Sequence, residues 1–125
     1  MTHRSVLAAL AAALALAACD GGTDSPPGGE YRAVLESPHK EEGALAVELT
    51  GPGIESISAD AGSLFTQPSG ASTRVVVIRE PAGRIEFRVT MAAGQQPPAA
   101  RIIEVVDEED RPRESLDGYR LDFRR

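Results

Sequence analysis

Apolar and polar side chains alternate in three separate segments, and this period of two constrains the fold more than any other feature of the chain. In residues 84–90, Ile85, Phe87 and Val89 alternate with charged residues. The same alternation places Leu45, Val47 and Leu49 on one face of residues 44–50, and Tyr119, Leu121 and Phe123 on one face of residues 119–124. Successive side chains of a strand point to opposite faces, so each segment predicts a half-buried strand of an antiparallel sheet.

Other segments complete an all-β pattern. The β-branched runs 75–78 and 102–106 predict more central strands, and residues 31–35 and 54–58 are further candidates. Turn signals separate the runs at residues 51–53, 68–70, 81–83, 94–98 and 117–118. No helical period follows Ala18, and residues 58–65 have room for one helical turn at most. Residues 31–125 are therefore predicted to form a single antiparallel β-sandwich, immunoglobulin-like or cohesin-like, of about seven short strands.

The first residues have the design of an export signal. A short segment with Arg4 precedes about a dozen apolar residues, Val6 to Ala18, which is typical of a signal peptide. As a helix this run would span ~20 Å, less than the ~30 Å of a bilayer's hydrocarbon core. Residues 1–18 are therefore predicted to be a cleaved signal rather than a transmembrane helix.

The end of that signal carries four residues with a specific meaning. Leu16, Ala17, Ala18 and Cys19 resemble the lipobox of bacterial lipoprotein precursors at all four positions. The resemblance implies that a signal peptidase recognises Leu16, Ala17 and Ala18. It also implies that Cys19 receives diacylglyceryl and palmitate groups, which anchor the chain to membrane lipid. Cys19 is the only cysteine, so it has no disulfide partner within the chain. An ordinary signal peptide that ends by chance in cysteine is the alternative.

Residues 19–30 are predicted to be a flexible tether after the lipidated cysteine. Residues 20–30 contain no apolar side chain and are rich in glycine and proline. A coil of this length reaches roughly 18 Å. The domain is expected in the cell envelope, on the periplasmic or surface side of a membrane. Asp20 follows the cysteine, and which membrane holds the anchor stays open.

The charge and the side-chain inventory argue against several functions. A net charge of −6 disfavours nucleic-acid binding, which needs clustered positive charge. His39 is the only histidine after the signal and lies in a polar turn without a nucleophile motif, so we expect no enzyme and no catalytic residue. Of the five aromatic side chains, only Tyr31 and Phe65 are not needed for the core, too few for a dedicated sugar-binding platform.

Two charged surfaces remain as candidates. Residues 107–114 hold the densest run of carboxylates, which suits a solvated hairpin loop or, alternatively, an ion- or glycan-binding site, for example for calcium. Arg84, Arg88, Arg120 and Arg124 fall on the outward faces of two strands and would form a basic stripe if the strands were neighbours. Interleaved acidic residues favour ordinary solubility for this stripe. No metal or other cofactor is expected.

The middle of the domain carries a resemblance. Residues 57–65, followed by a strand and then by residues 83–89, resemble the middle of cohesin-type and related carbohydrate-binding-module sandwiches. This similarity implies a β-sandwich, and no functional residue carries over with it. The sequence as a whole favours a membrane-anchored, non-enzymatic binding or scaffolding module with an envelope protein as its partner. The alternative is the ion- or glycan-binding module at residues 107–114.

Overall fold

The computed structural model describes residues 28–125. These residues form only strands, turns and loops, without a helix. The strands are β1 (Gly29–Glu36), β2 (Glu42–Thr50), β3 (Ile54–Ser58), β4 (Ser63–Ser69), β5 (Ser72–Gly83), β6 (Glu86–Met91), β7 (Ala99–Val106) and β8 (Arg120–Arg124). The prediction of a single antiparallel β-sandwich is confirmed, with eight strands in place of about seven.

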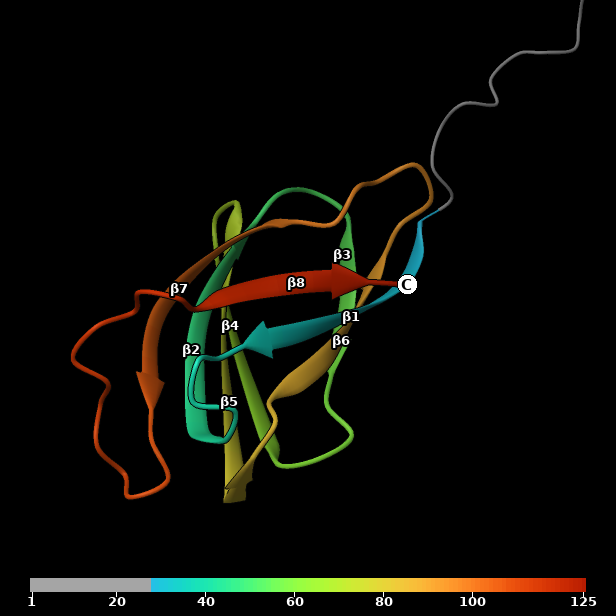
Figure 1. The fold of residues 1–125 in the computed structure, drawn as a ribbon. Coiled ribbons are helices and arrows are strands. Elements are labelled where there is room, and N and C mark those ends of the chain that lie inside the picture. Colours follow the sequence, from blue (N-terminus) through green and yellow to red (C-terminus); the bar gives the residue numbers. More distant parts are fainter. Residues whose placement is uncertain (1–27) are drawn as a thin grey trace, which may run out of the picture.

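Two four-stranded antiparallel sheets make up the sandwich (Figure 1). Sheet A has the order β3-β6-β1-β8, and sheet B has the order β4-β5-β2-β7. In the view of Figure 1, β1 and β8 of sheet A run across β2 and β5 of sheet B. The first strand of the fold thus lies in the interior of one sheet, and the second strand lies in the interior of the other.

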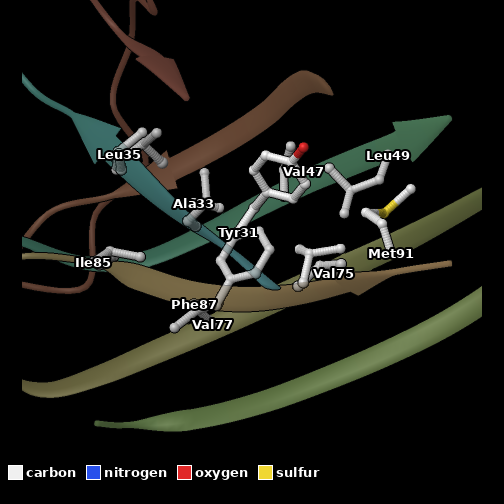
Figure 2. Packing of buried hydrophobic residues seen from close by; sticks show 13 residues of the cluster. Tyr31, Ala33, Leu35, Val47, Leu49, Val75, Val77, Ile85, Phe87 and Met91 are labelled. Carbon is white, nitrogen blue, oxygen red and sulfur yellow. The ribbon is translucent and has the colours of Figure 1, made fainter. Parts of the chain in front are cut away.

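The core lies between the sheets and is built from the alternating positions (Figure 2). The inward residues predicted for 44–50 and 84–90 are all buried: Leu45, Val47, Leu49, Ile85, Phe87 and Val89. Tyr119, Leu121 and Phe123 are half-buried and pack against this cluster. The period of two therefore predicted correctly which face of these strands is dry.

Several boundaries differ from the expectation. Residues 58–65 contain no helical turn, because Ser63–Ser69 forms strand β4 against β5. Residues 81–83 are the end of β5 rather than a turn, and Gly83 pairs with Glu42 at the start of β2. Strand β1 begins at Gly29, so the last two residues of the predicted tether belong to the fold.

Residues 102–106 were expected in a central strand, and this prediction is wrong. Strand β7 is an edge strand of sheet B. Its free side is partly covered by the following segment, because the Arg113 amide donates to the Val105 carbonyl and Val106 forms a bridge with Pro112. Residues 102–106 are rich in apolar side chains because one face of β7 packs on the core and residues 111–113 shield the free edge of the strand.

Candidate functional site

The lipobox and most of the tether lie outside the described residues. Leu16, Ala17, Ala18 and Cys19 all belong to residues 1–27, and their roles stay predictions. Residues 28–125 contain no helix with the length and apolarity that a membrane crossing requires.

His39 lies in the turn between β1 and β2 and is exposed. Its backbone amide donates a hydrogen bond to Ser37 Oγ at 2.9 Å, and its ring centroid lies 6.2 Å from that of Tyr119. The side chain of Ser37 donates instead to Glu42. The geometry thus gives no activated serine beside His39, since the hydroxyl hydrogen is directed at a carboxylate.

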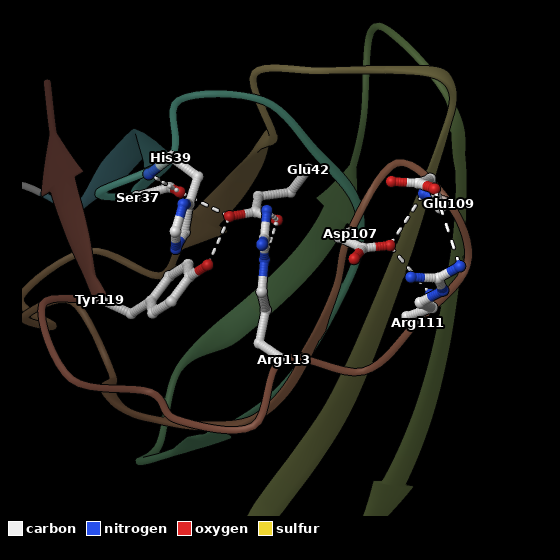
Figure 3. A network of polar contacts seen from close by, with 8 residues as sticks. All are labelled: Ser37, His39, Glu42, Asp107, Glu109, Arg111, Arg113 and Tyr119. Atoms are coloured by element: carbon white, nitrogen blue, oxygen red, sulfur yellow. Dashed lines mark hydrogen bonds and ion pairs between the residues drawn. The ribbon is translucent and has the colours of Figure 1, made fainter.

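Glu42 is the most unusual polar residue of the domain, and the sequence did not single it out. It is only 1% exposed and receives hydrogen bonds on both carboxylate oxygens (Figure 3). Ser37 Oγ and Tyr119 Oη donate to Oε2, each at 2.5 Å, and Arg113 donates to Oε1 at 3.0 Å. A buried carboxylate is tolerated only when it is paired and hydrogen-bonded in this way.

The Glu42 network shifts the pKa values of its partners. Burial raises the pKa of Tyr119, and the hydrogen bond to Glu42 raises it further. Burial alone would lower the pKa of Arg113, but the hydrogen bond and the charge of Glu42 outweigh it and hold that pKa above its ordinary value. Both oxygens of Glu42 accept hydrogen bonds from the protein, so the network connects the β1–β2 turn to Arg113 and Tyr119.

The acidic loop after β7 is built around Asp107. Its Oδ1 accepts hydrogen bonds from the backbone amides of Glu109 at 2.8 Å and Arg111 at 2.9 Å (Figure 3). The backbone hydrogen bond from Arg111 is the main reason that the pKa of Asp107 is lowered. Within the described residues, no group of three or more histidine, cysteine, aspartate or glutamate side chains is arranged to hold a metal ion. Asp107, the first carboxylate of the loop, thus stabilises the conformation of the loop.

This arrangement makes stability depend on pH through Asp107. A carboxyl whose pKa is lower in the folded state stabilises the fold above its unfolded pKa, about 3.9, and this contribution is lost as the pH falls toward the folded value. Asparagine does not titrate in this range. We therefore expect the melting temperature of Asp107→Asn to fall less than that of the wild type between pH 6 and pH 3. Parallel curves from thermal scans of the two proteins would contradict this assignment.

The predicted basic stripe takes a different form. Strands β6 and β8 are not neighbours, because β1 lies between them and places Arg32 opposite both Arg88 and Arg124. Arginines and carboxylates on and beside the outer face of sheet A pair with one another, as in Arg32–Glu86 at 3.9 Å and Arg120–Asp122 at 2.9 Å. In all, Arg32, Arg84, Arg88, Arg120 and Arg124 pair with Glu30, Glu36, Asp60, Glu86 and Asp122. This face is charge-balanced rather than basic.

The outer face of sheet B is apolar at one end over β4, β5 and β2, and exposed Glu104 on β7 borders it beside Ala46. Because Val75 and Val77 are buried, the alternate residues Val76 and Ile78 face outward. They stand in register with Phe65 on β4 and with Ala44 and Ala46 on β2. We call Ala44, Ala46, Phe65, Val76 and Ile78 the apolar face. Phe65 is 58% exposed and Ile78 is 41% exposed, and they are the two large hydrophobic side chains most open to solvent in residues 28–125.

Tyr31 and Phe65, the two aromatic residues that the core was not expected to need, lie in different environments. Tyr31 was expected to be available, but it is buried in the core, where its hydroxyl accepts a hydrogen bond from Arg125 at 2.7 Å. The prediction for Tyr31 is therefore wrong, because β1 is an interior strand and its odd-numbered residues face inward. Phe65 is exposed, as expected for an aromatic residue that the core does not need.

Strand β4 is an edge strand without any charged residue. Its sequence is SLFTQPS. The other edges are protected: β3 carries Glu55, β8 carries Arg120, Asp122 and Arg124, and β7 is partly covered by residues 111–113. Natural proteins usually protect free edges with charges or proline, and β4 has only Pro68, near its end. An edge with so little protection beside apolar residues is a feature of interaction surfaces.

An open hollow of about 790 Å³ adjoins the apolar face at Ile78. Its wall includes five acidic residues, Glu41, Glu80, Glu108, Glu109 and Asp110, which together with the hollow we call the acidic hollow. Arg79 also lines it, but its guanidinium donates to the Arg84 carbonyl at 3.0 Å. Glu109 forms an ion pair with Arg111. Within residues 28–125, no ion pair includes Glu41, Glu80, Glu108 or Asp110.

Comparison with known proteins gives no match to a family model, to a curated protein or to a solved structure. The resemblance of residues 57–65 and 83–89 to cohesin-type sandwiches stays a prediction. In the structure these residues cover the end of β3, the start of β4 and most of β6.

Proposed function

We propose that this chain is an envelope lipoprotein whose β-sandwich is a non-enzymatic binding or scaffolding module. Acyl chains on Cys19 hold it to membrane lipid, and an envelope protein docks on the sandwich. The observation that carries the binding role is the apolar face, where Phe65 is 58% and Ile78 is 41% exposed beside the uncharged edge of β4. Contiguous exposed apolar surface costs solubility, and soluble domains that keep it commonly use it to bind.

The layout of the domain suits a binding module that is tethered to a membrane. The chain enters the fold at Gly28, beside Arg125, whose guanidinium donates to the Gly28 carbonyl at 3.2 Å. The loop with Glu108, Glu109 and Asp110 lies at the opposite side of the domain in Figure 1. Because the predicted flexible tether joins the domain on the Gly28 side, the opposite side, with the loop after β7, is open to a partner.

The anchoring part of the proposal predicts a complete loss of lipid attachment in Cys19→Ala. Two or three acyl chains make membrane attachment effectively stable, whereas a chain without them has no comparable anchor. Cells grown with labelled palmitate should yield labelled wild-type protein in the membrane fraction and unlabelled Cys19→Ala protein. Cys19→Ser provides a second variant that keeps a nucleophilic side chain. An unlabelled wild-type protein in a strain whose other lipoproteins are labelled would contradict the anchor.

The binding part is tested by crosslinking the full-length protein at its membrane and identifying the captured proteins by mass spectrometry. One reproducible partner, lost in Cys19→Ala and in Phe65→Ser, is the expected result. Loss in the first variant reports on location, and loss in the second reports on the apolar face. A partner that is still captured after Phe65→Ser and Ile78→Thr are combined would place its docking surface elsewhere.

A further inference from the structure

The apolar face and the acidic hollow are continuous, and together they restrict the chemistry of the partner. Ile78 belongs to both: it stands in register with Ser63 and Ala44 on the sheet, and it lines the hollow. The next residues of β5, Arg79 and Glu80, continue along the wall of the hollow. A partner seated on Phe65, Val76 and Ile78 therefore reaches the carboxylates as it extends beyond the end of the apolar face.

The opposite end of the same sheet face has a different character. There Gln67, Arg74, Glu48 and Arg101 stand in one row, and Arg101 pairs with Glu48 at 3.2 Å. This row is polar, contains both signs of charge and is partly neutralised by the ion pair. The acidic hollow thus marks one end of the apolar face, which gives the surface a direction.

Charge complementarity decides which partner fits. The face of sheet A is neutralised by its own ion pairs, while Glu41, Glu80, Glu108 and Asp110 surround the hollow without an arginine or lysine partner among residues 28–125. Gathered carboxylates repel one another, and a cationic group placed among them removes that repulsion. Lysine or arginine side chains of a docked chain supply such groups.

We propose that the partner contributes a polypeptide segment in which apolar side chains are followed by lysine or arginine side chains. The apolar side chains cover Phe65, Val76 and Ile78, and the basic side chains enter the acidic hollow. This inference rests on the proposed binding function and adds the chemistry and the direction of the bound segment. Affinity then depends on salt, because the charges in the hollow are open to solvent.

Two fluorescent peptides test the inference on the full chain in detergent micelles. Both carry the same alternating valine–threonine segment, followed in one by lysines and in the other by glutamates. By fluorescence polarisation at low salt, the lysine peptide should bind about tenfold more tightly, the sum expected from a few exposed ion pairs. This preference should vanish near 1 M salt, where the Debye length is about 3 Å.

Matched charge variants locate the effect. The combined variant Glu80→Gln, Glu108→Gln, Asp110→Asn should lose the preference for the lysine peptide. The control Glu55→Gln, Glu114→Gln, Asp117→Asn changes the net charge equally at exposed sites outside the hollow and should keep the preference. Phe65→Ser should weaken both peptides alike. Thermal scans establish that the variants are folded.

The possible failures are distinct. Equal binding of the two peptides, or equal loss in the hollow variant and its control, overturns the basic-segment inference, even where crosslinking in cells still captures a partner at the apolar face. Sedimentation of the full chain as a dimer that Phe65→Ser converts to a monomer also overturns it, because a second copy then occupies the face. Absence of peptide binding together with absence of any partner in cells overturns both this inference and the proposed function.

Discussion

Replacement of Glu42 by alanine is expected to destabilise the domain by about 3 kcal/mol. Removing one partner of a buried ion pair costs about 3–5 kcal/mol, and the effect lies at the lower end here because the Arg113 side chain keeps 22% exposure. The alanine leaves the guanidinium of Arg113 and the hydroxyls of Ser37 and Tyr119 without their acceptor. A domain of this size has only about 5–15 kcal/mol of stability in total. Urea denaturation of wild type and variant measures the difference.

Glu48→Ala is the matched control for this prediction. Glu48 lies on the same strand and also pairs with an arginine, but its partner Arg101 is 71% exposed, so its loss should cost less than about 1 kcal/mol. Glu42→Ala should also cost less in an Arg113→Ala background than alone, because the two residues then no longer depend on each other. Equal effects of Glu42→Ala and Glu48→Ala would show that the buried network does not stabilise the fold.

Phe87→Ala is expected to cost about 3–5 kcal/mol, through lost burial and the cavity that remains. Phe87 is 1% exposed on β6, opposite the small residue Ala33 of β1, and lies among core residues of both sheets (Figure 2). The neighbouring sheets cannot collapse into the vacant space without breaking their ladders. The midpoint of denaturation should therefore fall steeply, or the variant should fail to accumulate.

Phe65→Ala provides the same chemical change on the surface. Because Phe65 is 58% exposed on the outer face of an edge strand, its truncation should change the free energy of unfolding by no more than about 0.5 kcal/mol. The contrast between the two phenylalanines separates a role in the core from a role in binding. A large loss of stability in Phe65→Ala would mean that the apolar face supports the fold rather than a partner.

The alternation of side chains was sufficient to predict the class of the fold. Wherever a segment alternated clearly, as in 44–50 and 84–90, the sequence identified both the strand and its buried face. Strand β4 was not predicted, because Ser63–Ser69 has mostly polar residues and a proline and because an exposed edge strand imposes little pattern on its sequence. The order of strands depends on contacts between distant segments, which local pattern does not specify.

The candidate site was less predictable for the same reason. Glu42 seemed to belong to a solvated turn, and its partners Arg113 and Tyr119 are 71 and 77 residues away in the chain. The apolar face did leave a signal: the run from Val75 to Ile78 is apolar on both faces. In a sheet covered on one side only, this means that Val76 and Ile78 face outward, with Val76 half-buried and Ile78 exposed. The sequence placed Arg84, Arg88, Arg120 and Arg124 on outward faces and favoured solubility for them, but it did not show that β1 inserts Arg32 between β6 and β8.

Site-specific photo-crosslinking in living cells tests the binding role most directly. A photoreactive residue is placed in the full chain at Phe65, on the apolar face, or at Arg120, on the charge-balanced face of sheet A, where the native side chain is 72% exposed. We predict one discrete crosslinked product from position 65 that is absent from position 120 and is lost when Cys19→Ala is added. Products of equal yield from both positions, or none from position 65, would contradict a docking site on the outer face of sheet B.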